Sequence, residues 1–85
     1  MKLHILKIRR DYLFDIMFKG KTFELRKDDR EYEVGDLIHF VDPDGKEYFH
    51  YSDMVFKIHY ILRDVPQYGL ASEFCILAIR PFTEN

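Results

Sequence analysis

The chain has few cysteines, little net charge and no long apolar run, and each shortage excludes a class of protein. The single cysteine, Cys75, excludes an internal disulfide and a metal site built from several cysteines. No apolar run approaches the ~20 residues that a membrane-spanning helix needs, so we expect no membrane partner. The N-terminus becomes charged at Lys7 and lacks the apolar stretch of a secretory signal, so the simplest expectation is a cytoplasmic protein.

Motifs for several common chemistries are also missing. The sequence has no glycine-rich phosphate loop and no Ser-His-Asp order that would indicate a nucleophilic triad. Its four histidines are His4, His39, His50 and His59, and they form neither an H-x-x-x-H nor an H-x-H pattern. We therefore predict no metal and no cofactor. Cys75 lies among apolar neighbours, so we expect a buried, inert thiol.

Charge is distributed unevenly along the chain. The formal net charge is only -2, but residues 1–30 hold nine Lys or Arg against five Asp or Glu, and residues 31–85 hold four against ten. The basic first third is suited to meeting phosphates, while the acidic remainder repels nonspecific polyanions. The alternative, that both stretches are ordinary solvated surfaces, stays open at this point.

A length of 85 residues predicts a single domain, 1–85. We expect a helix over Asp11–Phe18, with Asp11 as its N-cap and Gly20 at its exit, and tight turns at Val34–Asp36 and Asp42–Gly45. The expected strands are Lys2–Ile8, Thr22–Lys27, Leu37–Val41, Glu47–Tyr51 as the second arm of a hairpin, Met54–Leu62, and Phe74–Ile79 as a central strand. The fold class is thus α+β and mostly β, with five or six strands and one short helix after the first. This pattern indicates a closed or nearly closed barrel, although a sandwich would satisfy it too.

The segment Thr22–Lys27 carries the most informative alternation. Phe23 and Leu25 share one face, and Thr22, Glu24 and Arg26 share the other. We expect the apolar pair to face the core and the polar row to face outward. In the strand Met54–Leu62, the expected core face consists of Phe56, Ile58, Tyr60 and Leu62.

Lys21, Glu24 and Arg26 also match a known signature. They occupy the last three fixed positions of G-x-K-x-x-E-x-R, the signature of the ASCH domain superfamily, which the chain therefore resembles. Lys19 stands where that signature has its Gly, and Gly20 lies one place later. ASCH domains have a PUA-like barrel fold, so the resemblance favours the barrel over the sandwich.

The resemblance is closer to a small uncharacterised ASCH-like family of bacterial and phage proteins, and it extends over nearly the whole chain. The matching segments, in order, are His4–Ile8, Lys21–Arg30, Val34–Asp36, Ile58–Leu62 and Gly69-Leu70. The chain departs from that family at Tyr51–Met54, where Tyr-Ser-Asp-Met replaces a usual Tyr-Thr-Gly-Arg.

The resemblance implies a binding module for RNA or a modified nucleotide, in a cleft lined by the K-x-x-E-x-R motif. Lys21 and Arg26 would contact phosphate or base, and Glu24 would read a base edge. Arg30 and His4 lie in matching segments and are further candidates, and Tyr60 is a candidate for stacking on a base. Without the motif, Glu24 and Arg26 would be interpreted as an exposed ion pair of about 0–1 kcal/mol.

Two other functions stay open. Some compact ASCH proteins are amidohydrolases acting on acetylated cytidine and use a Lys, a Thr and an acid. Lys21 matches that Lys as a general base or activator, but Glu24 stands at the Thr position. The third function is a protein-interaction adaptor. Exposed strand edges allow either a monomer or a weak homodimer.

Several flanking residues have both a structural and a functional interpretation. Gly35 is expected to supply a positive φ, Asp36 to accept hydrogen bonds within its turn, and Asp29 to tie its loop to nearby backbone. The aromatic residues Tyr48, Phe49 and Tyr51 are suited either to stacking on bases or to packing at the barrel rim.

Overall fold

The computed structural model describes residues 1–51 and 54–83. Its strands are β1 (Leu3–Lys7), β2 (Phe23–Lys27), β3 (Leu37–Val41), β4 (Phe56–Leu62) and β5 (Phe74–Pro81), with helix α1 (Arg10–Phe18) after β1 and a 3-10 turn η1 (Pro66–Tyr68) after β4. The described residues thus confirm an α+β, mostly β fold with five strands and one short α-helix after the first strand.

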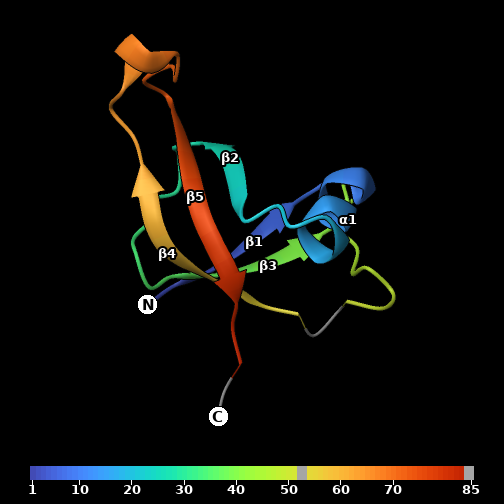
Figure 1. Cartoon of the computed structure of the whole chain (residues 1–85). Coiled ribbons are helices and arrows are strands. Elements are labelled where there is room, and N and C mark those ends of the chain that lie inside the picture. The colour runs from blue at the N-terminus through green and yellow to red at the C-terminus, as the bar shows by residue number, and fades with distance from the viewer. Residues whose placement is uncertain (52–53, 84–85) are drawn as a thin grey trace.

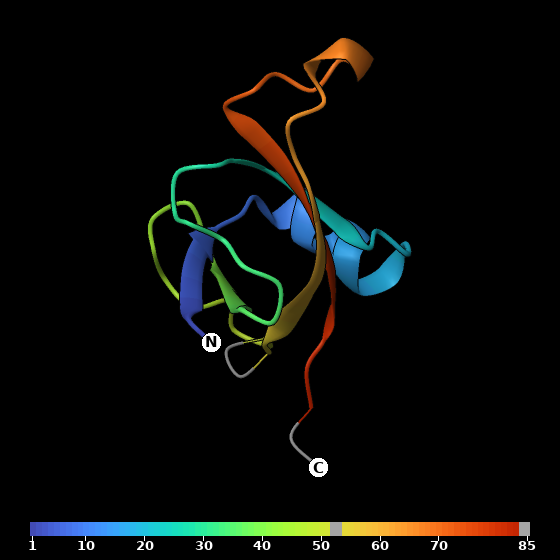
Figure 2. The ribbon, with the colours of Figure 1, turned by 90° about the vertical axis from the view of Figure 1, so that its left-hand side faces the viewer.

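The five strands form one curled sheet in the order β1-β3-β4-β5-β2. The β1–β3 pair is parallel, and the other three pairs are antiparallel. Figures 1 and 2 show the sheet curling on itself into a half-barrel, with β5 between β4 and β2 as expected of a central strand. Strands β1 and β2 are the two edges, so the half-barrel is open between them.

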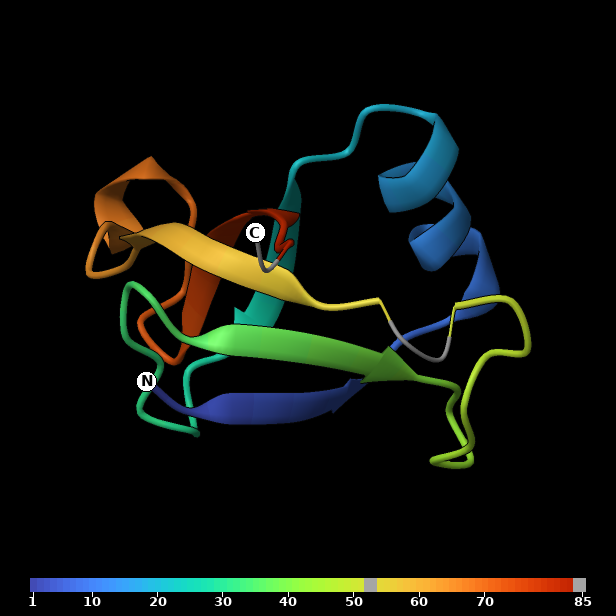
Figure 3. The ribbon, with the colours of Figure 1, turned by 90° about the horizontal axis from the view of Figure 1, so that it is seen from below.

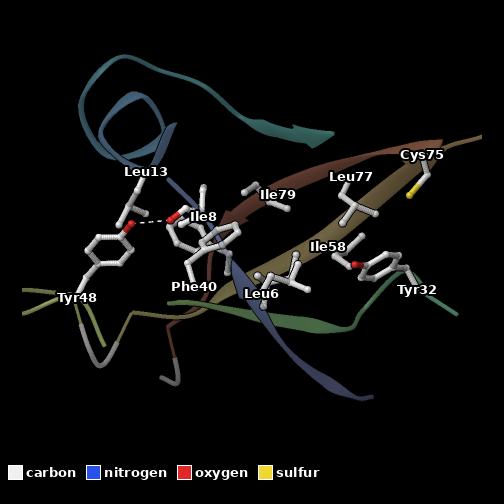
Figure 4. Packing of buried hydrophobic residues seen from close by; sticks show 12 residues of the cluster. Leu6, Ile8, Leu13, Tyr32, Phe40, Tyr48, Ile58, Cys75, Leu77 and Ile79 are labelled. Carbon is white, nitrogen blue, oxygen red and sulfur yellow. Dashed lines mark hydrogen bonds between the residues drawn. The ribbon is translucent and has the colours of Figure 1, made fainter. Parts of the chain in front are cut away.

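The core lies inside this curl. In β1 the side chains alternate strictly, with His4 and Leu6 buried and Leu3, Ile5 and Lys7 exposed. The three central strands each add a fully buried aliphatic side chain, namely Ile38 of β3, Ile58 of β4 and Leu77 of β5. Figure 4 shows Leu6, Ile58 and Leu77 packed with the other residues of this core, among them several aromatic rings and the buried Cys75.

Helix α1 covers one end of the curl and is attached by a narrow apolar face. Leu13 is buried, and Ile16 and Met17 pack against the core, as the helical spacing predicts. Phe14 and Phe18 lie one turn apart on the exposed side and pack with tilted rings, whose centroids are 4.9 Å apart. Figure 3 shows the helix beyond the end of β1, beside the segment that follows β3.

The predicted C-terminal end of the helix is confirmed, and the predicted N-cap is wrong. Gly20 has a φ of 75° and makes the expected exit. The helix begins one residue early, so Arg9 is the N-cap without a side-chain cap and Asp11 lies inside the first turn. Asp11 pairs there with Arg9 at 3.0 Å, and both side chains are exposed.

The predicted faces of β2 are inverted. Phe23 and Leu25 are 48% and 54% exposed, whereas Glu24 is only 5% exposed. Antiparallel partners share a face, and Glu24 pairs with Leu77, whose side chain fills the core. Alternation separates the two sets of side chains, but only the pairing with β5 decides which set lies inside.

A bulge overturns the prediction that Tyr60 faces the core. The β4–β5 register shifts between Ile58 and Tyr60, so alternation moves by one residue. Phe56 and Ile58 are buried as expected, but Tyr60 is 60% exposed and Ile61 packs against the core instead.

The predicted hairpin after β3 forms only its turn. The backbone NH of Asp42 donates to the Lys46 carbonyl, and Gly45 has a positive φ of 85°. Beyond it the described residues show a single bridge, between Val41 and Glu47, and no strand at 47–51. Of the segment 51–54, where the sequence departs from the ASCH-like pattern, residues 52 and 53 lie outside the described residues.

The Val34–Asp36 turn is built as predicted. Gly35 has a φ of 99°, and Asp36, 1% exposed, accepts hydrogen bonds from the backbone NH groups of Glu33 and Lys2 and bonds His4 at 2.8 Å. Burial raises the pKa of Asp36, but these hydrogen bonds outweigh burial and lower it. His4 is therefore a structural residue of this turn.

His39 of β3 links the sheet to the segment after it. Its Nδ1 lies 2.9 Å from the Met54 carbonyl oxygen, and its Nε2 lies 2.6 Å from Glu47 Oε2. Both partners accept, so both ring nitrogens donate only in the protonated imidazolium. Burial lowers the pKa of His39, but the two acceptors outweigh burial and raise it.

This contact predicts a pH dependence of stability. The folded state holds the His39 proton more tightly than the unfolded chain, so the stabilisation is complete below the unfolded pKa of ~6.5 and lost as pH rises through the raised folded pKa. Urea unfolding at about pH 6 and about pH 9 should show a smaller loss with pH for Glu47→Gln than for wild type. Asp44→Asn, in the exposed turn nearby, is the control and should keep the wild-type loss. An identical loss in Glu47→Gln would contradict the assignment.

Candidate functional site

A groove of about 610 Å³ lies between helix α1 and strand β2, at the open side of the half-barrel. Five basic side chains line it (Lys7, Arg9, Lys21, Arg26 and Lys27) against two acidic ones (Asp15 and Glu24). Its apolar surface comes from Ile8, Tyr12, Phe23 and Leu25. The groove is thus cationic with an apolar lining, which suits an anion that carries a ring or a sugar.

Glu24 is the centre of the groove's charge network. Its Oε1 lies 3.5 Å from Lys21 Nζ, and its Oε2 accepts a hydrogen bond from Arg26 Nε at 2.8 Å. The Glu24 side chain is 7% exposed, and the two cations are 18% and 21% exposed. The interpretation as an exposed ion pair is therefore wrong, because one carboxylate shared by two cations is largely out of water.

The turn after α1 places Lys21. Its backbone NH donates to the Asp15 carbonyl at 3.1 Å, which continues the helix exit at Gly20. Its Nζ then lies 4.7 Å from the centre of the Tyr12 ring and 5.5 Å from that of Phe23. A carboxylate and two aromatic faces are all contacts that favour a cation.

Arg26 of β2 and Arg30 of the loop after β2 both reach the edge strand β1. The Arg26 guanidinium donates through Nη2 to the Lys7 carbonyl, and Arg30 Nη1 donates to the Ile5 carbonyl at 3.3 Å. Both carbonyls belong to β1, on the edge that does not pair with β3. We call this pair of contacts the arginine seam, since side chains here close a gap that backbone hydrogen bonds leave open.

The structure brings together only part of the predicted site. Lys21, Glu24 and Arg26 converge in the groove, and Arg30 lies next to them along the seam. His4 does not line the groove, because it is 7% exposed and bonds Asp36 while its ring packs 4.8 Å from Tyr32. Tyr60 pairs with Ala78 and lies on the outer face of the sheet, since the bulge turns it outward.

The groove also contains lining residues that the sequence pattern did not predict. Lys7 is the last residue of β1, Arg9 lies between β1 and α1, and Tyr12 and Asp15 belong to the helix. The signal available in the sequence was the basic stretch between the first strand and the helix. It lies far from the motif along the chain and joins it only through the curl of the sheet.

The acid that ties down the loop after β2 is Asp28 rather than Asp29. Asp28 Oδ2 lies 2.8 Å from Arg63 Nε, and Arg63 Nη2 donates to the Tyr32 carbonyl at 3.3 Å. The side chain of Asp29 is exposed. Close by, burial raises the pKa of the Cys75 thiol, which is 0% exposed, in agreement with the predicted inert cysteine.

Two general findings concern ligands and membranes. Within residues 1–51 and 54–83, no three His, Cys, Asp or Glu side chains gather closely enough to hold a metal ion. Within the same ranges, no helix has the length and apolar character needed to cross a membrane.

Comparison with known proteins gives a family and a fold. The family model described as "Domain of unknown function (DUF3850)" matches residues 3–79. No curated protein matches the sequence. Among solved structures, "Crystal structure of hypothetical protein PH0355" is similar, with a TM-score of 0.62 and 15% identity over 96% of this chain and 100% of that one. Similarity at that identity shows a shared fold and nothing about activity.

The Glu24 network predicts a measurable contribution to stability. Glu24→Gln leaves two cations side by side in a largely desolvated position, so we expect a loss of about 1–2 kcal/mol in the free energy of unfolding. Urea unfolding at neutral pH measures it.

The matched control is Asp11→Asn, which removes a carboxylate from the pair with Arg9 on the same side of the molecule. Those two side chains are 59% and 66% exposed, so we expect a loss below about 0.5 kcal/mol. Equal losses in the two variants would mean that Glu24 is not the centre of the network.

Proposed function

The chain belongs to the DUF3850 family, a domain family of unknown function, and for this member we propose binding of single-stranded RNA or a nucleotide in the groove between α1 and β2. The observation that carries the proposal is the excess of cations in a concave site with an apolar lining. Phosphate contacts would supply most of the affinity, and the aromatic side chains would accept a sugar or a base.

Donor capacity supports this proposal. In its contacts with described residues, Arg26 uses Nε for Glu24 and Nη2 for the Lys7 carbonyl, and the guanidinium has five N–H donors in all. Lys21 similarly uses one of the three donors on its ammonium. Glu24 thus orients two cations whose remaining donors are available for phosphate oxygens in the same groove.

The resemblance of the K-x-x-E-x-R segment to ASCH domains points in the same direction and stays a prediction. An adaptor would need a flat face with Arg26 directed to bulk solvent. The concave groove and the 21% exposure of the Arg26 side chain favour a ligand-binding role over that one.

The amidohydrolase alternative is less well supported by the geometry. A general base or activating amine requires a neutral Lys21, and its three neighbours at the site are all partners of a cation. Glu24, at the position of the Thr, is already shared between two cations. The alternative is tested by incubating acetylated cytidine with the protein and following deacetylation by chromatography, where we expect no turnover.

Binding to groove phosphates predicts a salt dependence that one substitution reduces. We expect the dissociation constant of a labelled single-stranded RNA to rise with salt, and Lys21→Gln to weaken binding about threefold to tenfold while lowering the log–log slope by about 0.7. Fluorescence anisotropy at several salt concentrations measures both quantities.

Lys46→Gln is the matched control, because Lys46 is an exposed lysine in the Asp42–Gly45 turn region and does not line the groove. It should bind as wild type does. Arg26→Ala is a poorer probe, since it also removes half of the arginine seam. A dissociation constant that does not change with salt, or equal effects of the two lysine substitutions, would count against the proposal.

A further inference from the structure

A second hollow lies on the other flank of helix α1, and its walls are aromatic. It is a pocket of about 250 Å³ between the helix and the segment after the Asp42–Gly45 turn. Its wall consists mainly of the rings of Phe14, Phe18, Phe49, His50 and Tyr51, with Arg10 at the rim. We call it the aromatic pocket. Figure 3 shows the helix and this segment approaching each other beyond the ends of β1 and β3.

The rings form a continuous wall. The Phe14 and Phe18 centroids are 4.9 Å apart, and Phe18 meets Tyr51 edge-on at 6.5 Å. His50 joins Tyr51 at 6.4 Å and Phe49 at 4.6 Å, both edge-on. Phe14, Phe18 and Phe49 are 49%, 60% and 88% exposed, so ring surface on these three side chains is accessible to a further partner.

A buried anchor holds the wall in place. Tyr48 is 9% exposed, and its hydroxyl donates to the Ile8 carbonyl at 2.5 Å. Figure 4 marks this hydrogen bond with a dashed line. The contact ties the segment that carries Phe49 to the end of β1. Tyr48 is therefore a packing residue. Phe49 beside it is 88% exposed, so its ring is accessible to a ligand.

The lining indicates the class of ligand. Among the residues that the structure describes, no carboxylate lines the aromatic pocket, and the charged guanidinium of Arg10 disfavours a cationic guest. Its volume is smaller than the ~300–1,000 Å³ typical of sites for drug-sized ligands. An uncharged planar ring system fits these properties, and stacking on ring faces would hold it.

The aromatic pocket is connected to the groove around the start of α1. A cleft of about 970 Å³ lies between them, and Arg9 lines both that cleft and the groove, while Arg10 lines both the cleft and the aromatic pocket. Four carboxylates also line the cleft, and two of them are already paired, Asp11 with Arg9 and Glu47 with His39. Three basic side chains, Arg9, Arg10 and Lys19, line the same cleft, and Arg9 and Arg10 lie where it meets the two sites.

We infer that the aromatic pocket receives one nucleobase of the same strand whose phosphates lie in the groove. This inference rests on the proposed function and adds to it a base-binding site on the opposite flank of the helix. It assigns stacking to Phe14, Phe18 and Phe49, and guidance of the connecting backbone to Arg9 and Arg10.

The test compares a single-stranded RNA with an abasic strand of the same length and charge. Wild type should bind the intact strand roughly fivefold to hundredfold more tightly, the range that stacking of one base supplies. Phe49→Ala should lose most of that preference and keep the wild-type salt slope, because no phosphate contact is removed. Phe49→Tyr, which keeps a ring, should restore the preference.

The controls separate this inference from the proposed function. Tyr68→Ala removes a ring that is 84% exposed at η1, away from both sites, and should leave the preference unchanged. The exposure of Phe49 makes unfolding of its variant a minor risk, and a thermal melt checks it.

Salt-dependent binding of wild type with equal affinity for intact and abasic strands would overturn the inference and leave the proposed function standing. A base preference that survives in Phe49→Ala would also overturn the aromatic pocket as its source. If neither strand binds, the proposed function fails, and the inference fails with it.

Discussion

The constraint on which the rest of this structure depends is the unpaired edge between β1 and β2. Five strands curl far enough to bring these edges near each other, but not into backbone pairing. Arg26 and Arg30 bridge the gap by donating to the Lys7 and Ile5 carbonyls, which would otherwise remain as an exposed strand edge. Guanidinium groups suit this task because they stay charged and present several donors in one plane.

The same constraint accounts for the buried acid. A cation at the seam must approach the interior, where loss of water is unfavourable for a charge. Glu24 offsets this desolvation penalty by sharing its carboxylate between Arg26 and Lys21. Strand β2 therefore has its polar face inside the half-barrel and its apolar face outside, which is the reverse of the usual arrangement. The groove arises from this arrangement, since closing the seam with charged side chains leaves donors facing the space beside α1.

Helix α1 separates two environments that differ in chemistry. On the flank toward β2 it faces lysines and arginines, and on the other flank Phe14 and Phe18 face the aromatic segment anchored by Tyr48. The helix is short and is attached through a narrow apolar face centred on Leu13. A polyanion with ring substituents is a ligand that uses both environments, because phosphate and base need opposite surroundings.

Periodicity and turn residues were enough to predict the fold class and most element positions, and the resemblance of the segment Lys21–Arg26 to the ASCH signature pointed to Lys21, Glu24 and Arg26 as one site. These features are local, since they depend on alternation, on glycines with positive φ and on residues two or three apart. The inside face of β2, the outward Tyr60, the pairing of His4 with Asp36 and the distant Arg9 were decided only by tertiary structure. Each depends on the register with a neighbouring strand or on the curl of the whole sheet, which no local pattern specifies.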